Sequence, residues 1–169
     1  MTEYSIRLLE LADAPIIERA FSSFGLNKPA QKFADYFAEQ QAGSRVVLVA
    51  TVDEVFAGYV TICWRSHYRP FREANFPEIV DFNVLPHFRQ QGIGTRLLDE
   101  AESRIFADHP VVGIGVGMTA DYGPAQHMYV RRGYLPDGRG LMYEGYPVSY
   151  GKNISVDDDL CLYFTKNRD

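Results

Sequence analysis

A chain of 169 residues suits one compact domain, which can bury a substantial core without metals or disulfides. Hydrophobic residues make up 46% of it and charged residues 23%, proportions that exclude wholesale disorder. A formal charge of -5 repels polyanions, so nucleic acid is not an expected partner.

The start of the chain and its cysteines predict a cytoplasmic protein. Residues 1–4 offer neither a basic leader nor an apolar stretch, and no apolar run approaches the roughly 20 residues that span a bilayer. Cys63 and Cys161 each lie in an apolar, strand-like run, which predicts thiols of the core. The four histidines show no zinc-type spacing with either cysteine. We therefore expect no membrane contact and no metal.

In chain order, the hydrophobic pattern predicts strands that alternate with helices in one domain over residues 1–169. Asp13 is the expected N-cap of the first helix, and residues 143–150 are a candidate for one additional hairpin. The predicted strands cover residues 4–9, 45–51, 55–64, 78–85, 111–118, 141–143 and 160–165. The predicted helices cover residues 14–24, 29–43, 92–107 and 124–132, and residues 65–77 are read as a loop.

The most informative segment, residues 84–95, joins a predicted strand to a predicted helix through two glycines. Free backbone N–H groups meet the positive end of the helix dipole at such a junction, which favours an anion. Gly92 and Gly94 let a phosphate approach where a Cβ would obstruct it. Taken alone, the segment is equally typical of ordinary turn chemistry, and it is neither a Walker loop nor GxGxxG. A second glycine cluster at residues 113–117 has no helix directly after it, which argues against a dinucleotide site.

Two motifs make the chain resemble the GNAT N-acetyltransferase superfamily. Residues 89–94, Arg-Gln-Gln-Gly-Ile-Gly, resemble the family's R/Q-x-x-G-x-G/A motif, and Val84-Leu85-Pro86 stands at its V-x-P. Residues 125–134, Ala-Gln-His-Met-Tyr-Val-Arg-Arg-Gly-Tyr, resemble A-x-x-L-Y-x-x-x-G-F. The resemblance implies a three-layer α/β (α+β) fold, in which about four helices flank a mixed, twisted sheet of about seven strands. The parallel central strands, here residues 79–85 and 111–118, would splay apart.

The resemblance also implies acetyl-CoA as the co-substrate. Its pantetheine arm would lie along the backbone of the strand before the glycines, and its pyrophosphate at the turn itself. Tyr122 occupies the place where the family commonly has asparagine, which leaves a cofactor contact there in question. The implied cofactor-binding residues are Phe82, Asn83, Val84, Arg89, Gln90, Gln91, Gly92, Ile93, Gly94, Thr95 and Tyr122.

The implied reaction is direct attack of a primary amine on the thioester in a ternary complex. In the family, the tyrosine that corresponds to Tyr129 often protonates the departing thiolate, and the alternative is a buried aromatic without a chemical role. For the base, Glu78 fits the family's glutamate near the start of this strand. Asp81 is the physical oddity, a carboxylate within an apolar strand. Alternation places the two carboxylates on opposite faces unless a bulge intervenes, and a reaction that uses neither is also open.

The sequence leaves the acceptor open among small-molecule amines and protein amines, and it leaves the acyl length and a possible homodimer open as well. The basic, aromatic segment 64–72 is a candidate cover of the acceptor site that attracts an acidic group, or else a solvated loop. Residues 157–159, Asp-Asp-Asp, read as a solvated turn rather than a metal or polyamine site. The alternative function is a non-catalytic acyl-CoA-binding module. A third, RNA binding through residues 64–72, is disfavoured.

Overall fold

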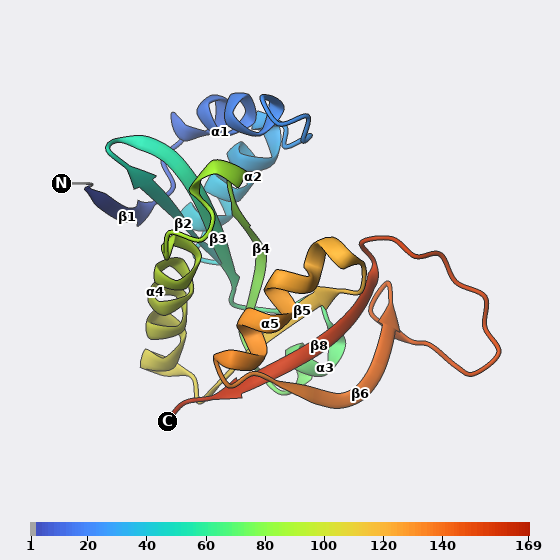
Figure 1. Cartoon of the computed structure of the whole chain (residues 1–169). Helices are drawn as coiled ribbons and strands as arrows, with labels where there is room; N and C mark the ends of the chain where they lie inside the picture. Colours follow the sequence, from blue (N-terminus) through green and yellow to red (C-terminus); the bar gives the residue numbers. More distant parts are fainter. Residues whose placement is uncertain (1–2) are drawn as a thin grey trace. The chain divides into compact units, whose positions relative to one another are not determined.

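The computed structural model describes residues 3–169, which form two compact units (Figure 1). The first unit comprises Met1–Trp64 and Ile79–Arg104, and the second comprises Arg65–Glu78 and Ile105–Asp169. The prediction about the start of the chain rests partly on Met1 and Thr2, which lie outside the described residues. The organisation as one domain stays a prediction.

The first unit contains strands in the order β1-β2-β3-β4. β1 (Tyr4–Leu8), β2 (Arg45–Val52) and β3 (Val55–Cys63) are antiparallel neighbours. β4 (Glu78–Val84) comes next, with all but its first residue in this unit. Nearly every residue of β2 and β3 is buried, so both faces of these strands are covered.

Two helices of the first unit, α1 (Asp13–Ser22) and α2 (Ala30–Gln41), lie side by side in Figure 1. Their apolar stripes pack on β2 and β3 and complete a core that includes Ile17, Phe33 and Tyr59. The hydrophobic pattern predicted both helices because apolar residues recur along them at helical spacing.

Asp13 is not the N-cap that the sequence predicted, because it is the first residue of α1 and Ala12 occupies the cap position. Its carboxylate instead accepts the backbone N–H of Glu10 and pairs with both terminal nitrogens of Arg7 at 2.7 Å. Through these bonds the carboxylate stabilises the turn that precedes the helix.

The helix α4 (Ile93–Asp108) begins in the first unit, after the short 3-10 helix η1 (Pro86–Phe88). One face of the helix is apolar and fully buried, and it consists of Leu97, Leu98, Ala101 and Ile105. The helix start is therefore held at a defined place by its packed face.

The second unit has strands in the order β5-β8-β6-β7, each antiparallel to its neighbour. Their bounds are Val111–Gly117 for β5, Leu135–Tyr143 for β6, Tyr146–Pro147 for β7 and Leu160–Asn167 for β8. The helices of this unit are α3 (Arg69–Glu73) and α5 (Gly123–Arg131), and the 3-10 helix η2 (Ala120–Tyr122) precedes α5. The segment between β7 and β8 extends away from the strands (Figure 1).

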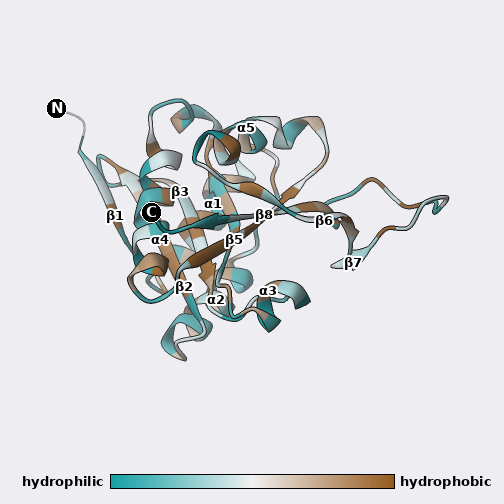
Figure 2. Ribbon diagram, turned by 90° about the horizontal axis from the view of Figure 1, so that it is seen from below, coloured by the Kyte–Doolittle hydropathy of each residue, from teal (hydrophilic) through white to brown (hydrophobic). Residues whose placement is uncertain are grey.

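The second glycine cluster has a structural role on β5, a strand that appears largely hydrophobic in Figure 2. Its glycines stand at alternate positions and so share one face of the strand. An aromatic ring covers each glycine so closely that an added Cβ would overlap with it. The Cβ would lie 2.2 Å from the Phe71 ring at Gly113, 2.9 Å from the Tyr163 ring at Gly115 and 2.4 Å from the Tyr122 ring at Gly117. Three rings therefore rest directly on the backbone of β5.

The predicted α/β class is confirmed, and the helix α3 was not predicted. The strand β7 pairs with β6 within residues 143–150, the segment named as a candidate for an additional hairpin. No helix within this part of the chain is both long and apolar enough to cross a bilayer. Among the same residues, no group of three or more His, Cys, Asp or Glu side chains is arranged to hold a metal ion.

Candidate active site

The turn before α4 has the backbone of an anion cradle. Gln90 and Gly92 both adopt left-handed conformations, with φ of 59° and 82°. The first backbone bond of the helix runs from the Arg96 N–H to the Gly92 carbonyl at 3.0 Å, so the N–H groups of Ile93–Thr95 precede the helical ladder. No atom lies within 4 Å of the place where a Gly92 Cβ would stand. The backbone there is open to a ligand.

Two side chains of the turn are used by the turn itself. Arg89 Nε donates to the Val84 carbonyl at 2.9 Å, and Gln91 Nε2 donates to the His87 carbonyl at 2.8 Å. The first bond ties the turn to the end of β4, and the second lies within the turn. The two side chains therefore stabilise the conformation of the turn.

The predicted pantetheine strand lies in the same unit as the cradle. Phe82, Asn83 and Val84 are half-buried on β4, and a Cβ at Gly58 of β3 would lie 2.6 Å from the Asn83 carbonyl. The two strands therefore approach closely at this point. The structure thus brings residues 82–84 and 89–95 together in the first unit.

Asp81 is the centre of an ionic cluster in the first unit. Its backbone is left-handed, with φ of 48°, so the alternation of β4 is interrupted here. Its carboxylate pairs with Lys28 Nζ at 2.8 Å and Lys32 Nζ at 2.7 Å, and it accepts hydrogen bonds from Tyr36 and Asn83. Burial by itself would raise the pKa of Asp81, but Lys28 and then Lys32 outweigh it and lower the pKa to about 2.

Glu78 belongs to the second unit and is buried, with 6% of its surface exposed. The Ser66 hydroxyl donates a hydrogen bond to its carboxylate, and the same oxygen of Ser66 accepts the backbone N–H of Tyr68. Burial, and after it the charge of Glu78, raises the pKa of the Tyr163 phenol. The negative charge of Glu78 therefore disfavours ionisation of Tyr163, whose ring covers Gly115.

Tyr129 lies on α5 in the second unit and is 5% exposed. Burial raises the pKa of its phenol, and no charged group contributes to the shift. Within residues 3–169 the hydroxyl has no hydrogen-bond partner. Its ring contacts that of Tyr134, with centroids 5.8 Å apart. Tyr129 is thus a buried, protonated phenol at neutral pH.

Tyr122, the residue in place of the family's asparagine, also lies in the second unit. Its ring rests on Gly117, and its hydroxyl donates to Asp158 Oδ1 at 2.8 Å. Burial, and then Asp158, raises the pKa of this phenol. Tyr122 therefore connects the end of β5 to the acidic segment before β8.

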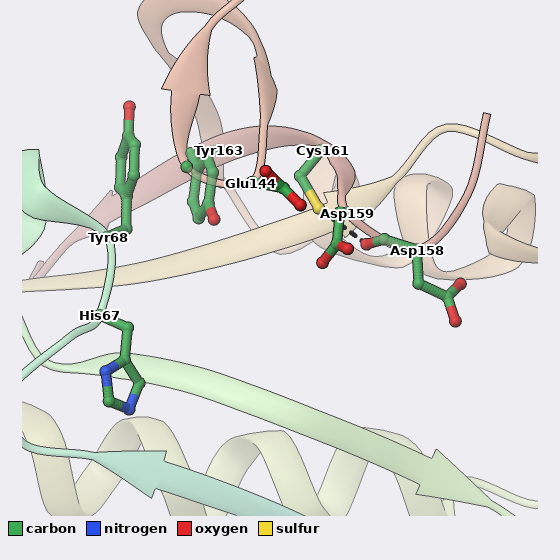
Figure 3. A pocket seen from close by; sticks show the side chains of 8 residues that line it. His67, Tyr68, Glu144, Asp158, Asp159, Cys161 and Tyr163 are labelled. Carbon is green, nitrogen blue, oxygen red and sulfur yellow. Dashed lines mark hydrogen bonds between the residues drawn. The ribbon is translucent and has the colours of Figure 1, made fainter. Parts of the chain in front are cut away.

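A cavity of about 480 Å³ in the second unit was not predicted from the sequence (Figure 3). It is lined by His67, Tyr68, Glu144, Gly145, Asp158, Asp159, Cys161 and Tyr163. The prediction that Cys161 is a core thiol is wrong, because Cys161 is half-buried on one side of this cavity. The apolar run of β8 signalled a strand, but not that one of its faces borders a cavity.

The arginines around His67 and Tyr68 are engaged in the local structure. Arg69 pairs with Glu73 at 2.6 Å, and Arg72 donates to the carbonyls of Ser66 and His67. The cavity that this segment lines carries carboxylates and no arginine. Its geometry does not match the predicted attraction of an acidic group.

A family model described as the acetyltransferase (GNAT) family matches residues 14–134, so the chain belongs to this acetyltransferase family. The resemblance inferred from the two motifs is confirmed. No curated protein sequence matches the chain.

Solved structures share the fold over nearly the whole chain. YncA from Salmonella typhimurium, solved with its cofactor acetyl-CoA, has 18% identity and a TM-score of 0.68, over 98% of this chain and 94% of that one. PaiA N-acetyltransferase from Thermoplasma acidophilum, in complex with coenzyme A, has 14% identity and a TM-score of 0.70, over 98% and 99%. The GNAT acetyltransferase from Streptococcus pneumoniae has 17% identity and a TM-score of 0.68, over 98% and 100%. The predicted GNAT-like fold is thus confirmed.

Proposed function

We propose that the protein transfers an acetyl group from acetyl-CoA to a primary amine in a ternary complex. The observation that carries this proposal is the open turn at Gly92, which presents the first N–H groups of α4 in a chain of an acetyltransferase family. Structures of the same fold that hold acetyl-CoA or coenzyme A support it.

The residues of the turn fit a diphosphate. The N–H groups of Ile93–Thr95 precede the helical ladder, and the helix dipole adds roughly 0.3–1 kcal/mol for an anion at this end. Most of the binding free energy must therefore come from the amide hydrogen bonds themselves. Phe82, Asn83 and Val84 would offer their backbone to the pantetheine arm, and acetyl-CoA supplies the activated acyl group when bound.

The acceptor nitrogen must lose a proton before it can attack, because an ammonium has no lone pair. An amine with a pKa near about 10.4 is almost entirely protonated at pH 7, so a base contributes strongly. The nitrogen then forms a C–N bond to the thioester carbonyl carbon, and the C–S bond breaks. Tyr129 donates its proton to the thiolate sulfur and regains one that the nitrogen releases. Overall one proton leaves to solvent and one ends on the thiol.

Glu78 is the better base of the two carboxylates in this proposal. Asp81 holds two ammonium groups and has a pKa lowered to about 2, so it is a weak proton acceptor at neutral pH. Glu78 is buried, and its charge is felt by Tyr163 and Cys161, which line the cavity. Asp81 then serves to order the bulge of β4 rather than to move protons.

Calorimetry with acetyl-CoA and a Gly92→Ala variant test the cradle. Because φ is 82° at Gly92, a Cβ strains the turn by about 1–2 kcal/mol although the space is open. We expect acetyl-CoA affinity to fall about tenfold as the turn relaxes to another conformation. Gly43→Ala is the matched control, since Gly43 has φ of 77° and equally open surroundings outside the cradle. Equal losses of affinity in the two variants would contradict the cradle.

Release of thiol from acetyl-CoA over a panel of amines tests the transfer itself. Turnover with at least one primary amine is the expected outcome. Tight acetyl-CoA binding without turnover on any amine would instead identify the non-catalytic binding module, and an absence of binding would sink the proposal as a whole.

A further inference from the structure

The cavity of the second unit has an acidic lining. Three of its eight lining residues carry carboxylates, Glu144, Asp158 and Asp159, and none is a lysine or an arginine. Burial, and then the charges of Asp159, Glu78, Asp158 and Asp157, raises the pKa of the Cys161 thiol to about 11. The carboxylates around the thiol give the cavity a negative electrostatic potential, and this potential favours binding of a cation.

The carboxylates of this region divide into two kinds. Asp158 accepts the Tyr122 hydroxyl, and Figure 3 shows its side chain turned away from Asp159. Asp157 accepts the Tyr143 hydroxyl and the backbone N–H of Asp159, so it caps the turn. Within residues 3–169, neither Glu144 nor Asp159 has a hydrogen bond or ion pair to its carboxylate. These two carboxylates are left for a ligand.

Two aromatic side chains, Tyr68 and Tyr163, also line the cavity. Tyr68 and Tyr163 stack with ring centroids 3.7 Å apart and an interplanar angle of 4°. Phe71 packs edge-on against both rings, so the stacked pair is held in place. Because the two rings cover each other's faces, they offer apolar ring edges to the cavity, and such edges suit methylene groups. An aliphatic cation matches both properties of the cavity.

The cavity is also connected to residues of the proposed reaction. Asp158 is bonded to Tyr122, at the position where a cofactor contact was predicted. Glu78, the proposed base, acts on Tyr163 and Cys161 of the lining. An amine bound here would therefore lie against Tyr163 and Cys161, the two lining residues that the charge of Glu78 affects.

We propose that this cavity binds the acceptor and that the acceptor is an aliphatic polyamine, with one ammonium group held by Glu144 and Asp159 and the reacting amine at the side of Tyr163 and Cys161. This inference rests on the proposed function. The volume of about 480 Å³ suits a small molecule rather than a folded protein segment. Residues 157–159 form an exposed turn, as predicted, and Asp158 and Asp159 of this turn also line the cavity while Asp157 supports them.

A matched pair of amines gives the first test. Acetyl transfer to 1,4-diaminobutane and to butylamine is compared, since the two differ by one ammonium group on the same carbon chain. We expect kcat/KM at least about tenfold higher for the diamine at low ionic strength, with the preference shrinking as salt screens the carboxylates. Equal kcat/KM values for the two amines would overturn the proposal, and so would a lysine-containing peptide that outperforms every diamine.

Charge-neutralising variants give the second test. Glu144→Gln and Asp159→Asn should each raise KM for the diamine about three- to fivefold, the effect of one solvent-screened ion pair, chiefly without lowering kcat. Asp108→Asn, which removes an exposed carboxylate outside the cavity lining, is the control and should leave KM unchanged. Calorimetry with 1,4-diaminobutane and coenzyme A should show the same order of affinities.

The outcomes separate the two proposals. If acetyl-CoA does not bind, or no amine is acetylated, the proposed function fails and this inference fails with it. If amines are acetylated but the two cavity variants behave as Asp108→Asn does, the proposed function stands and the polyamine site alone is refuted.

Discussion

Burial sets the chemistry of the Tyr129 phenol. Removal from water disfavours the phenolate, so the pKa lies above the ordinary value of 10.0 and the proton is present throughout the physiological range. Its hydroxyl has no hydrogen-bond partner in the described part of the chain, so the proton is not committed elsewhere. Burial thus keeps the proton on the phenol and at the same time makes the phenol a weaker acid, so donation to the thiolate depends on its position next to the sulfur.

Tyr129→Phe should therefore lower kcat by about 100-fold or more, the usual contribution of a positioned acid, and leave the dissociation constant of acetyl-CoA unchanged. The free energy of unfolding should not fall, since the lost hydroxyl makes no hydrogen bond within residues 3–169. Tyr134→Phe is the control, because it makes the same change on the neighbouring buried ring. A Tyr129→Phe enzyme with normal kcat would show that the phenol is only a packing residue.

Single residues also show what a sequence cannot predict. Asp81 was conspicuous because a carboxylate in an apolar strand needs compensation, and the structure contains that compensation. Its partners Lys28, Lys32 and Tyr36 come from a distant part of the chain, so no local pattern identifies them. The glycine turn before α4 could be located from the sequence because its motif is local, and its contacts with a cofactor stay a prediction.

At the scale of elements, the two main misses have local causes. The five-residue helix α3 was read as a loop, because it is too short to show a helical period. The strand β6 was predicted to begin at residue 141, but it begins at Leu135. The prediction was too short because Gly138 and Gly140 are typical of turns, and in the structure they adopt positive φ within a register shift of the strand. Longer periodic elements, such as α4 and β5, were predicted to within a few residues.

The contact between α3 and β5 yields a stability prediction. Gly113→Ala places a Cβ 2.2 Å from the Phe71 ring, so we expect a loss of about 1–3 kcal/mol of unfolding free energy in urea titrations. The loss should be smaller in a Phe71→Ala background, since the obstructing ring is then absent. Gly123→Ala is the control, because no atom lies within 4 Å of its Cβ position. Identical losses in both backgrounds would contradict the packing of the ring on the strand.

At the scale of the whole molecule, Asp81 links stability to acid. Its folded pKa of about 2 lies below the ordinary value of 3.8, so it stabilises the folded state above pH 3.8 and loses that effect as pH falls toward 2. The contribution is on the order of 2 kcal/mol. Asp81→Asn should therefore unfold more easily than the parent at pH 6, and the difference should narrow between pH 4 and pH 2.

Urea midpoints at several pH values measure this difference. Asp108→Asn controls for the loss of one surface carboxylate, since Asp108 is exposed. If the difference in urea midpoint between Asp81→Asn and the parent stays constant down to pH 2, the stabilisation by Asp81 does not depend on its negative charge.

Composition and motifs together predicted the class of the fold and the family, because element order and backbone motifs are written along the chain. The compartment, the one-domain organisation and the oligomeric state stay predictions. The acidic cavity escaped prediction for a different reason: its walls come from three separated segments, at residues 67–68, 144–145 and 158–163.

The three glycines on one face of β5 limit which sequence changes this part of the fold accepts. A larger residue at position 115 is tolerated only if the Tyr163 ring is lost or displaced, since a Cβ there meets that ring at 2.9 Å. Tyr163 is also a wall of the cavity. The shape of this cavity wall is therefore coupled to position 115, because a side chain there requires a second change at Tyr163.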